Sequence, residues 1–212
     1  MRFCFLPSPL TTPAVGSRLA AELERRGHEA VVAGGGETDT TDLLARFVAA
    51  AEGADVVVPH SNAGRFGPAV ASEVGAELVC LDALLPGGGE EGRWVDFLRA
   101  REQPDGLLAP WTRWWPEEDV LTVAGDHLEL LRADEPRVSL RLLLQDPPAP
   151  TGWLEHRSGY LGFGDTYADQ QALVAAHGWE VRRLDGTHLH LLTDPATVAE
   201  ALLDVVGLLG RP

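Results

Sequence analysis

Short apolar segments alternate along the chain with longer segments of helical periodicity, and this alternation limits the possible folds more than any other feature. Six segments are expected as strands, at residues 2–6, 28–34, 54–60, 76–86, 158–165 and 179–186. Strands that are almost uniformly apolar and alternate with helices form parallel sheets covered on both faces. The sequence therefore predicts an α/β fold with a mostly parallel sheet and helices on both faces.

The expected helices have one apolar face and recognisable ends. Thr40 or Thr41 is expected to cap the second helix, because a hydroxyl can accept a hydrogen bond from a free amide of the first turn. Asp194 and Pro195 are expected to begin the last helix, which runs to about Leu209. The first helix is expected to end at Gly27, since glycine readily adopts the conformation that stops a helix.

Length and charge limit the domain organisation and the partners. The 212 residues are 45% hydrophobic, which suits a single domain over residues 1–212. The net charge of -15 argues against nucleic acid, because phosphate contacts need a basic patch. No apolar run approaches 18 residues, and the N-terminal segment has no signal-peptide pattern, so we expect no membrane partner and a cytoplasmic location.

Both cysteines, Cys4 and Cys80, lie in expected strands. Two cysteines argue against a disulfide framework and against a cysteine metal site, and we expect both to be core residues. The histidines show no metal-ligand spacing, and the glycine runs at 34–36 and 87–89 lack the context of a phosphate loop. We therefore expect no metal and no cofactor.

Residues 86–150 break the alternation and are rich in proline, acidic residues and tryptophan. An insertion of this kind at the carboxyl edge of a parallel sheet covers the place where ligands bind. We expect a lid over residues 86–150 in which Trp111, Trp114 and Trp115 line a substrate pocket. The alternative is a helical excursion with a small core of its own.

The junction at Ser61 carries the main chemical signal. The segment Pro59-His60-Ser61-Asn62-Ala63 lies between an expected strand and an expected helix. A sharp strand-to-helix turn of this kind lifts a serine hydroxyl clear of the sheet, with the following amides turned toward developing negative charge. Taken alone the segment is also compatible with a serine that only caps a helix.

A serine nucleophile needs a base and an acid that orients the base. Asp165 and His188 each follow an expected strand and come in the order serine, acid, base. Asp82, at the end of the fourth strand, is the alternative acid, and His190 is the alternative base. His60 is expected to pack rather than ionise, and Asp169 and Asp185 are expected to be a helix cap and a turn residue.

With these residues assembled, the chain resembles a compact α/β-hydrolase-fold protein. The resemblance rests on "HSNAGRFGPAVA", "VCLDALLPGG", "GYLGFGDTYADQQALVAAHGW" and "DGTHLHLLTDPATVAEALL", and on "FLPSPLTTP" as the loop after the first core strand. It covers about 150 of 212 residues, and the opening strands of that family are expected to be absent. It implies Ser61 as nucleophile, Asp165 as acid and His188 as base, with the amides of Asn62 and Ser8 binding the oxyanion.

The function expected from these residues is serine-dependent hydrolysis of an ester, thioester or lactone with an apolar acyl part. The small-molecule substrate would be uncharged or only weakly anionic. Two alternatives are a non-hydrolytic cyclase, epimerase or lyase of secondary metabolism on the same fold, and a degenerate member that only binds a ligand. The sequence leaves a homodimer open.

Overall fold

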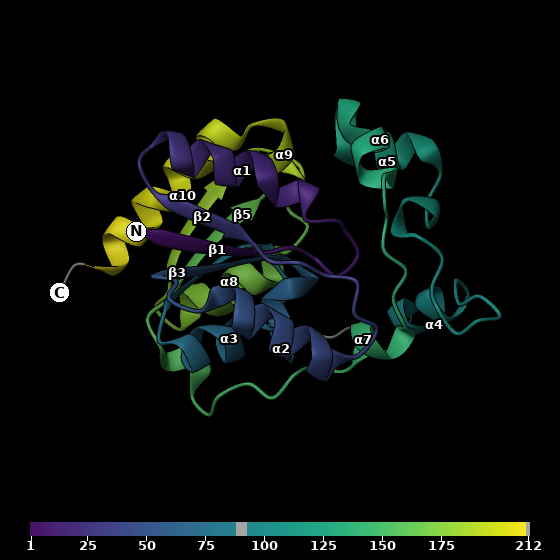
Figure 1. Ribbon diagram of the computed structural model, residues 1–212, viewed down its shortest axis with the longest axis horizontal. Coiled ribbons are helices and arrows are strands. Elements are labelled where there is room, and N and C mark those ends of the chain that lie inside the picture. The colour runs from purple at the N-terminus through teal and green to yellow at the C-terminus, as the bar shows by residue number, and fades with distance from the viewer. Residues whose placement is uncertain (88–92, 211–212) are drawn as a thin grey trace.

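A computed structural model describes residues 1–87 and 93–210, which form one parallel sheet flanked by helices (Figure 1). The sheet has six strands in the order β2-β1-β3-β4-β5-β6, and every paired register is parallel. The strands are β1 (Arg2–Leu6), β2 (Glu29–Val32), β3 (Val56–Ser61), β4 (Glu77–Ala83), β5 (Gly159–Phe163) and β6 (Glu180–Leu184). The predicted α/β fold is confirmed.

Helices cover both faces of this sheet, as Figure 1 shows. One face carries α1 (Ala14–Arg25), α9 (His190–Thr193) and α10 (Pro195–Leu209). The other face carries α2 (Thr40–Ala51), α3 (Gly67–Val74) and α8 (Ala168–Ala176). Two separate apolar cores follow from this arrangement, one on each side of the strands.

Successive side chains of β1 show why an inner strand of this sheet is apolar throughout. Phe3 and Phe5 point into the core beneath α1 and α10, while Cys4 and Leu6 point into the core beneath α2 and α3. Side chains of a strand alternate between its faces, so a strand covered on both sides needs no polar position. Cys4 and Cys80 are buried free thiols, and burial raises the pKa of Cys4 to about 11.

The helix ends follow local chemistry, with one correction. Gly27 has a φ of 84° and ends the α1 segment. Asp194 caps α10 by accepting from the amide of Thr197 at 3.2 Å. The cap of α2 is Asp39, whose Oδ1 accepts from the amide of Thr41 at 2.8 Å, so the expectation of Thr40 or Thr41 was wrong. An ionised carboxylate one residue earlier is the stronger acceptor.

The segment between β4 and β5 (residues 84–158, called the β4–β5 segment below) contributes no strand to the sheet in its described residues. Its helices are α4 (Arg93–Arg99), α5 (Glu117–Ala124), α6 (Leu128–Arg132) and α7 (Leu140–Leu144), with single 3₁₀ turns η2 (Trp111–Arg113), η3 (Gly125–His127) and η4 (Trp153–Glu155). Figure 1 places α4 to α7 beside the carboxyl ends of the strands. The expected lid of residues 86–150 falls in this segment, although residues 88–92 lie outside the described part of the chain.

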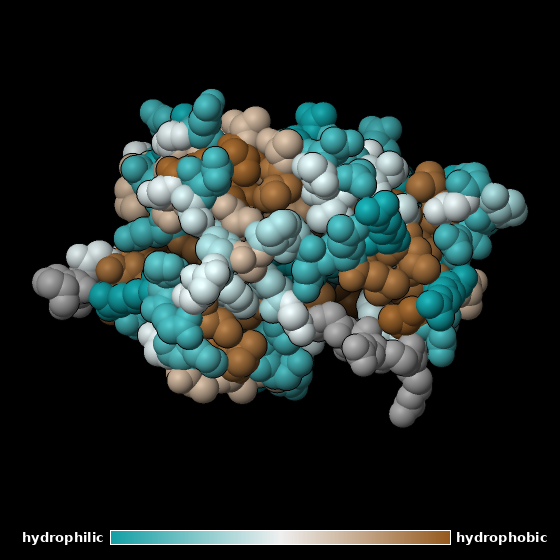
Figure 2. All heavy atoms as spheres, turned by 90° about the horizontal axis from the view of Figure 1, so that it is seen from below, coloured by the Kyte–Doolittle hydropathy of each residue, from teal (hydrophilic) through white to brown (hydrophobic). Residues whose placement is uncertain are grey.

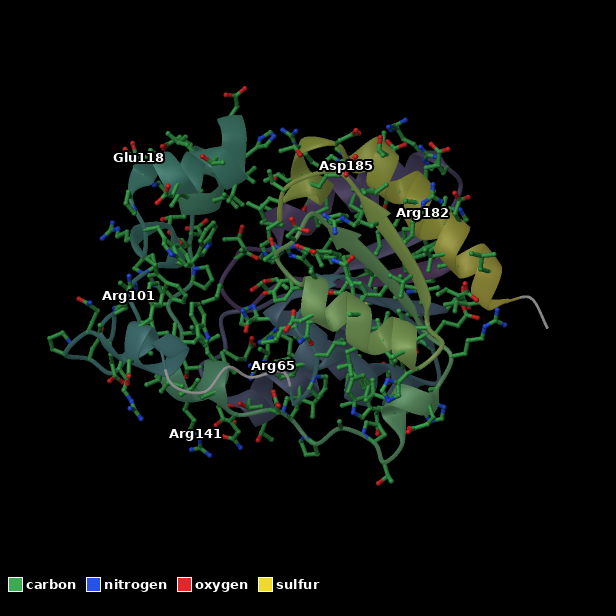
Figure 3. All side chains as sticks on the ribbon, turned by 180° about the vertical axis from the view of Figure 1, so that it is seen from behind. Arg65, Arg101, Glu118, Arg141, Arg182 and Asp185 are labelled. Carbon is green, nitrogen blue, oxygen red and sulfur yellow. The ribbon has the colours of Figure 1, made fainter. Side chains whose placement is uncertain are left out.

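The buried Arg65 and the carboxylate of Asp146 link an early residue of the β4–β5 segment, Gly87, to a later part of the same segment. Arg65 closes the 3₁₀ turn η1 (Asn62–Arg65), and its side chain is 1% exposed. Its Nη1 donates to the carbonyl of Leu143 at 3.0 Å and to Oδ1 of Asp146 at 3.2 Å, while the amide of Gly87 donates to Oδ2 of Asp146 at 2.8 Å. Figure 3 shows Arg65 where the sheet meets this segment.

Candidate active site

Ser61 ends β3 in a conformation that is unfavourable for a side chain. Its φ is 56° and its ψ is -131°, a region that non-glycine residues rarely adopt. The turn η1 begins at the next residue and leads into α3, so the serine sits at the corner between strand and helix. A strained backbone of this kind costs about 1–3 kcal/mol and is typical of functional sites.

Close packing behind this corner explains why its residues are small. A Cβ on Gly64 would lie 2.4 Å from the carbonyl oxygen of Leu84 and 2.7 Å from Cβ of Ala83. Ala63 is fully buried at the same place. The corner therefore needs a glycine at position 64, whereas position 63 accepts a methyl group.

A bulge in β4 directs Asp82 toward the candidate base. The register between β3 and β4 shifts by one residue, because His60 pairs with Leu81 and Ser61 pairs with Ala83. Asp82 is the extra residue, and its φ is 38°. Bulges turn a side chain out of the regular alternation and are frequent beside active sites.

The carboxylate of Asp82 is fully buried and has two hydrogen-bond donors. The amide of Phe163 donates to Oδ1 at 2.9 Å, and Nδ1 of His188 donates to Oδ2 at 2.7 Å. Beside it, the hydroxyl of Tyr160 accepts from the amide of Ala83 at 2.8 Å and donates to the carbonyl of the same residue at 2.7 Å. Burial and the nearby Asp82 raise the pKa of Tyr160, so this phenol stays a donor.

His188 follows β6 and presents its ring to the cavity. Its side chain is 21% exposed, and its Nδ1 is held by Asp82. One ring face stacks on His60 at 4.7 Å between centroids, and Tyr167 lies against the ring at 5.6 Å. Because Nδ1 carries the proton in this hydrogen bond, Nε2 of a neutral imidazole is free to accept one.

The structure contradicts the preference for Asp165 over Asp82 as the partner of this histidine. Asp165 is 84% exposed on its side chain and accepts from Nη2 of Arg183 at 2.7 Å. The chain turns directly after β5 at Gly164, whose φ is 66°, and this turn leads Asp165 away from the sheet edge. Asp82 reaches His188 because its own strand bulges.

The second candidate base, His190, packs against the end of β5. It begins α9, and its ring lies edge-on against Phe163 at 5.7 Å. Asp169 lies in the first turn of α8, where Tyr167 holds the cap position, so the expected cap role was wrong. Asp185 is exposed in the turn after β6, as expected (Figure 3).

A cavity of about 450 Å³ joins the candidate residues. Ser61 and His188 both line it, together with Ser8 and Asn62. Its remaining walls are mostly apolar and aromatic and come largely from the β4–β5 segment: Leu10, Trp94, Trp111, Trp114, Trp115, Val120, Val123, Tyr167 and Leu189. The structure thus brings the three expected tryptophans to the same cavity as Ser61.

The aromatic wall is held by a second arginine. The guanidinium carbon of Arg101 lies 3.2 Å from the ring centroid of Phe97, and Nη2 donates to the carbonyl of Trp114 at 2.7 Å. Nε1 of Trp114 donates to the carbonyl of Ala109 at 2.7 Å. Trp115 is 39% exposed. Apolar side chains also gather on the outer surface at this end of the molecule (Figure 2).

Solved structures of other proteins match this architecture over nearly the whole chain. An extracellular α/β-hydrolase from a Paenibacillus species matches with a TM-score of 0.74 at 14% identity and covers 97% of this chain and 98% of its own. The chain has the α/β-hydrolase fold. Tomato methylketone synthase I in complex with 2-tridecanone matches at 0.72 and 12% identity, covering 97% of both chains. A pyrethroid hydrolase matches at 0.69 and 21%, covering 98% of both.

The search of family models and the search of curated proteins found no match. The likeness therefore concerns the α/β-hydrolase fold alone.

Within this α/β-hydrolase fold, sequence reasoning missed several lining residues. Trp94, Asp119, Thr166 and Tyr167 also line the cavity. The concentration of tryptophan between residues 86 and 150 was a signal for Trp94, whereas nothing in the sequence marked Tyr167. Among the described residues no group of three or more histidine, cysteine or acidic side chains could hold a metal ion. None of the described helices has the length and apolar character needed to cross a bilayer.

Proposed function

We propose that this chain is a serine hydrolase that cleaves an ester, thioester or lactone with an apolar acyl part. One observation carries the proposal. A buried carboxylate, Asp82, fixes the proton of His188 on Nδ1, and this imidazole faces the same cavity as Ser61. Nucleophile, base and orienting acid are the three groups that acyl transfer by a serine requires.

The reaction follows from these positions. The hydroxyl oxygen of Ser61 attacks the acyl carbon while Nε2 of His188 accepts the hydroxyl proton. Asp82 stabilises the imidazolium, which then donates its proton to the leaving alcohol, thiol or lactone oxygen. A water molecule then attacks the acyl-serine while His188 accepts one of its protons. The bond between the acyl carbon and Oγ of Ser61 breaks, His188 returns the proton to Oγ, and the carboxylic acid is released.

Two backbone amides are proposed to stabilise the negative oxygen of the intermediate. Asn62 follows the strained serine at the start of η1, and Ser8 is buried in the loop after β1. Both residues line the cavity. Pro7 and Pro9 have no N–H, so in that loop the donor next to the cavity would be Ser8.

The cavity walls support an apolar, uncharged acyl part. Among the described lining residues no arginine is present, and Asp119 is the one carboxylate. An anionic substrate would meet this carboxylate without a cation to pair with it, and burying an unpaired charge is costly. The four tryptophans offer a large apolar contact area instead. We propose that the β4–β5 segment acts as the lid that supplies this wall, and that the reaction uses side chains and water without a cofactor.

The neighbours in structure support acyl chemistry and leave one alternative. They include an α/β-hydrolase and a pyrethroid hydrolase, and also methylketone synthase I bound to 2-tridecanone. A non-hydrolytic reaction of an acyl chain is therefore the second candidate. Mass spectrometry of the products separates the two, because hydrolysis adds one water and releases an acid.

The test is covalent labelling by a fluorophosphonate probe, followed by mapping of the adduct. We expect labelling at Ser61, no labelling in Ser61→Ala, and full labelling in the control Ser17→Ala, which removes an exposed hydroxyl of α1. Turnover of p-nitrophenyl esters of medium chain length should be lost in Ser61→Ala and kept in Ser17→Ala. A Ser61→Ala variant that keeps its labelling and turnover would overturn the proposal.

A further inference from the structure

His60 directly precedes Ser61 and is fully buried, yet its side chain contacts the residue proposed as the base. Its Nε2 lies 3.0 Å from the backbone carbonyl oxygen of His188. Its ring stacks on the ring of His188 at 4.7 Å with 23° between the planes. The ring of Phe5 stacks on the ring of His60 at 6.2 Å between centroids, with 24° between the planes.

The hydrogen bond decides the tautomer of His60. A carbonyl oxygen only accepts, so Nε2 must carry the proton and donate it. Burial and the neighbouring His188 hold the pKa of His60 well below its ordinary value, so the ring is neutral and Nδ1 is unprotonated. No hydrogen-bond partner of Nδ1 is found among the described residues. His60 is therefore a neutral donor rather than a proton carrier.

The loop that carries His188 needs such a donor. Asp185, Gly186 and Thr187 are exposed, and the sheet ends at Leu184. Asp82 holds Nδ1 of the imidazole, while the buried Leu189 anchors the chain that follows. The hydrogen bond from His60 fixes the backbone of His188 itself, from the strand that also ends in Ser61.

We infer that His60 is a positioning residue, which holds His188 in register with Ser61 by its hydrogen bond to the His188 carbonyl and by its ring stack. The inference rests on the proposed function, because His188 is the base only there. A misplacement of about 1 Å at a reacting group lowers rates about 100-fold. Loss of this hydrogen bond and ring stack should lower kcat and leave KM nearly unchanged, since His60 acts through His188.

Three substitutions separate the hydrogen bond from the stack. His60→Gln can place an amide donor where Nε2 lies, His60→Asn is a matched amide whose donor is too short to reach the carbonyl, and His60→Phe keeps a ring without a donor. We expect kcat to fall about 10- to 100-fold in the Asn and Phe variants and less than 10-fold in the Gln variant. His177→Gln, on the exposed end of α8, is the control histidine substitution and should keep the parent kcat.

Proton NMR supplies a readout that needs no substrate. The Nδ1 proton shared between His188 and Asp82 should give a sharp downfield resonance in the parent protein and in His60→Gln. It should broaden or disappear in His60→Asn and His60→Phe, while circular dichroism confirms that each variant is folded.

The outcomes separate the two proposals. Parent-like kcat and a sharp resonance in folded His60→Phe and His60→Asn would overturn the role of His60. A parent protein that neither labels nor turns over esters would defeat the proposed function, and the resonance would still report whether His60 holds His188. Rescue by glutamine with failure of asparagine supports the inference, and equal loss in both amide variants contradicts the hydrogen bond as its basis.

Discussion

Replacing Asp82 by asparagine should abolish most of the activity, and replacing Asp165 in the same way should not. In the Asp82→Asn variant the amide oxygen can still accept from Phe163, but the amide nitrogen then faces Nδ1 of His188. A donor at that position favours the tautomer with the proton on Nε2. That nitrogen can no longer take the proton of Ser61.

The size of the expected fall in kcat follows from the change of tautomer at His188. In serine hydrolases the same aspartate-to-asparagine change lowers kcat by about 10⁴ through the wrong tautomer, which is about 5.5 kcal/mol in the activation barrier. The side chain is nearly isosteric and Asp82 is fully buried, so the cavity keeps its shape and KM should change little. Asp165→Asn alters an exposed pair with Arg183 and should leave kcat within about twofold.

The assay is the rate of p-nitrophenyl ester hydrolysis at fixed pH, with the unfolding midpoint measured for both variants. If Asp82→Asn keeps more than a tenth of the parent kcat, the assignment of Asp82 is refuted. If instead the Asp165→Asn variant loses activity by orders of magnitude, the acid preferred from the sequence acts after all and the observed pairing is not the working one.

Further predictions concern stability. Ser61→Gly relieves the positive φ of 56° and should raise the unfolding temperature by about 2–4 °C, measured by calorimetry, while activity is lost. Arg65→Met leaves Asp146 and two carbonyls without their donor, and urea unfolding should show a loss of about 3 kcal/mol. The pKa of His60 is lowered by burial. Below about pH 6.5 this histidine therefore binds a proton in the unfolded chain and stays neutral in the folded chain. The free energy of unfolding should therefore be highest above about pH 6.5 and should decrease as the pH falls from there toward the depressed pKa. Between pH 7.5 and pH 5, urea titrations should show a smaller decrease in the free energy of unfolding for folded His60→Phe than for the parent.

The fold was predictable because its inner strands β1, β3, β4 and β5 are mostly apolar and buried on both faces. The expected strand at residues 2–6 matches β1, and the others agree within a few residues. The position of Ser61 and His188 on one cavity was predictable as well, because Ser61 ends one strand and His188 follows another at the edge where parallel strands end. These predictions depend on local pattern and on the direction of the strands, both of which a sequence displays.

The aspartate that pairs with His188 could not be assigned in this way. Asp82 and Asp165 both follow apolar strands, so residue type and order do not separate them. The choice depends on a one-residue register shift between β3 and β4 and on the turn at Gly164. Both are details of backbone geometry that residue type and apolar pattern do not display. The same reason explains why Tyr167 was missed as a wall residue.

The link from Arg65 through Asp146 to Gly87 has a consequence for how the wall of the cavity can vary. Gly87 and Asp146 are held at one point, since the carboxylate of Asp146 accepts from the amide of Gly87 and from the guanidinium of Arg65. The entropy of closing such a loop rises only with the logarithm of its length. Insertions, deletions or exchanges between Gly87 and Asp146 can therefore change the wall of the cavity at little thermodynamic cost to the sheet that carries Ser61 and Asp82.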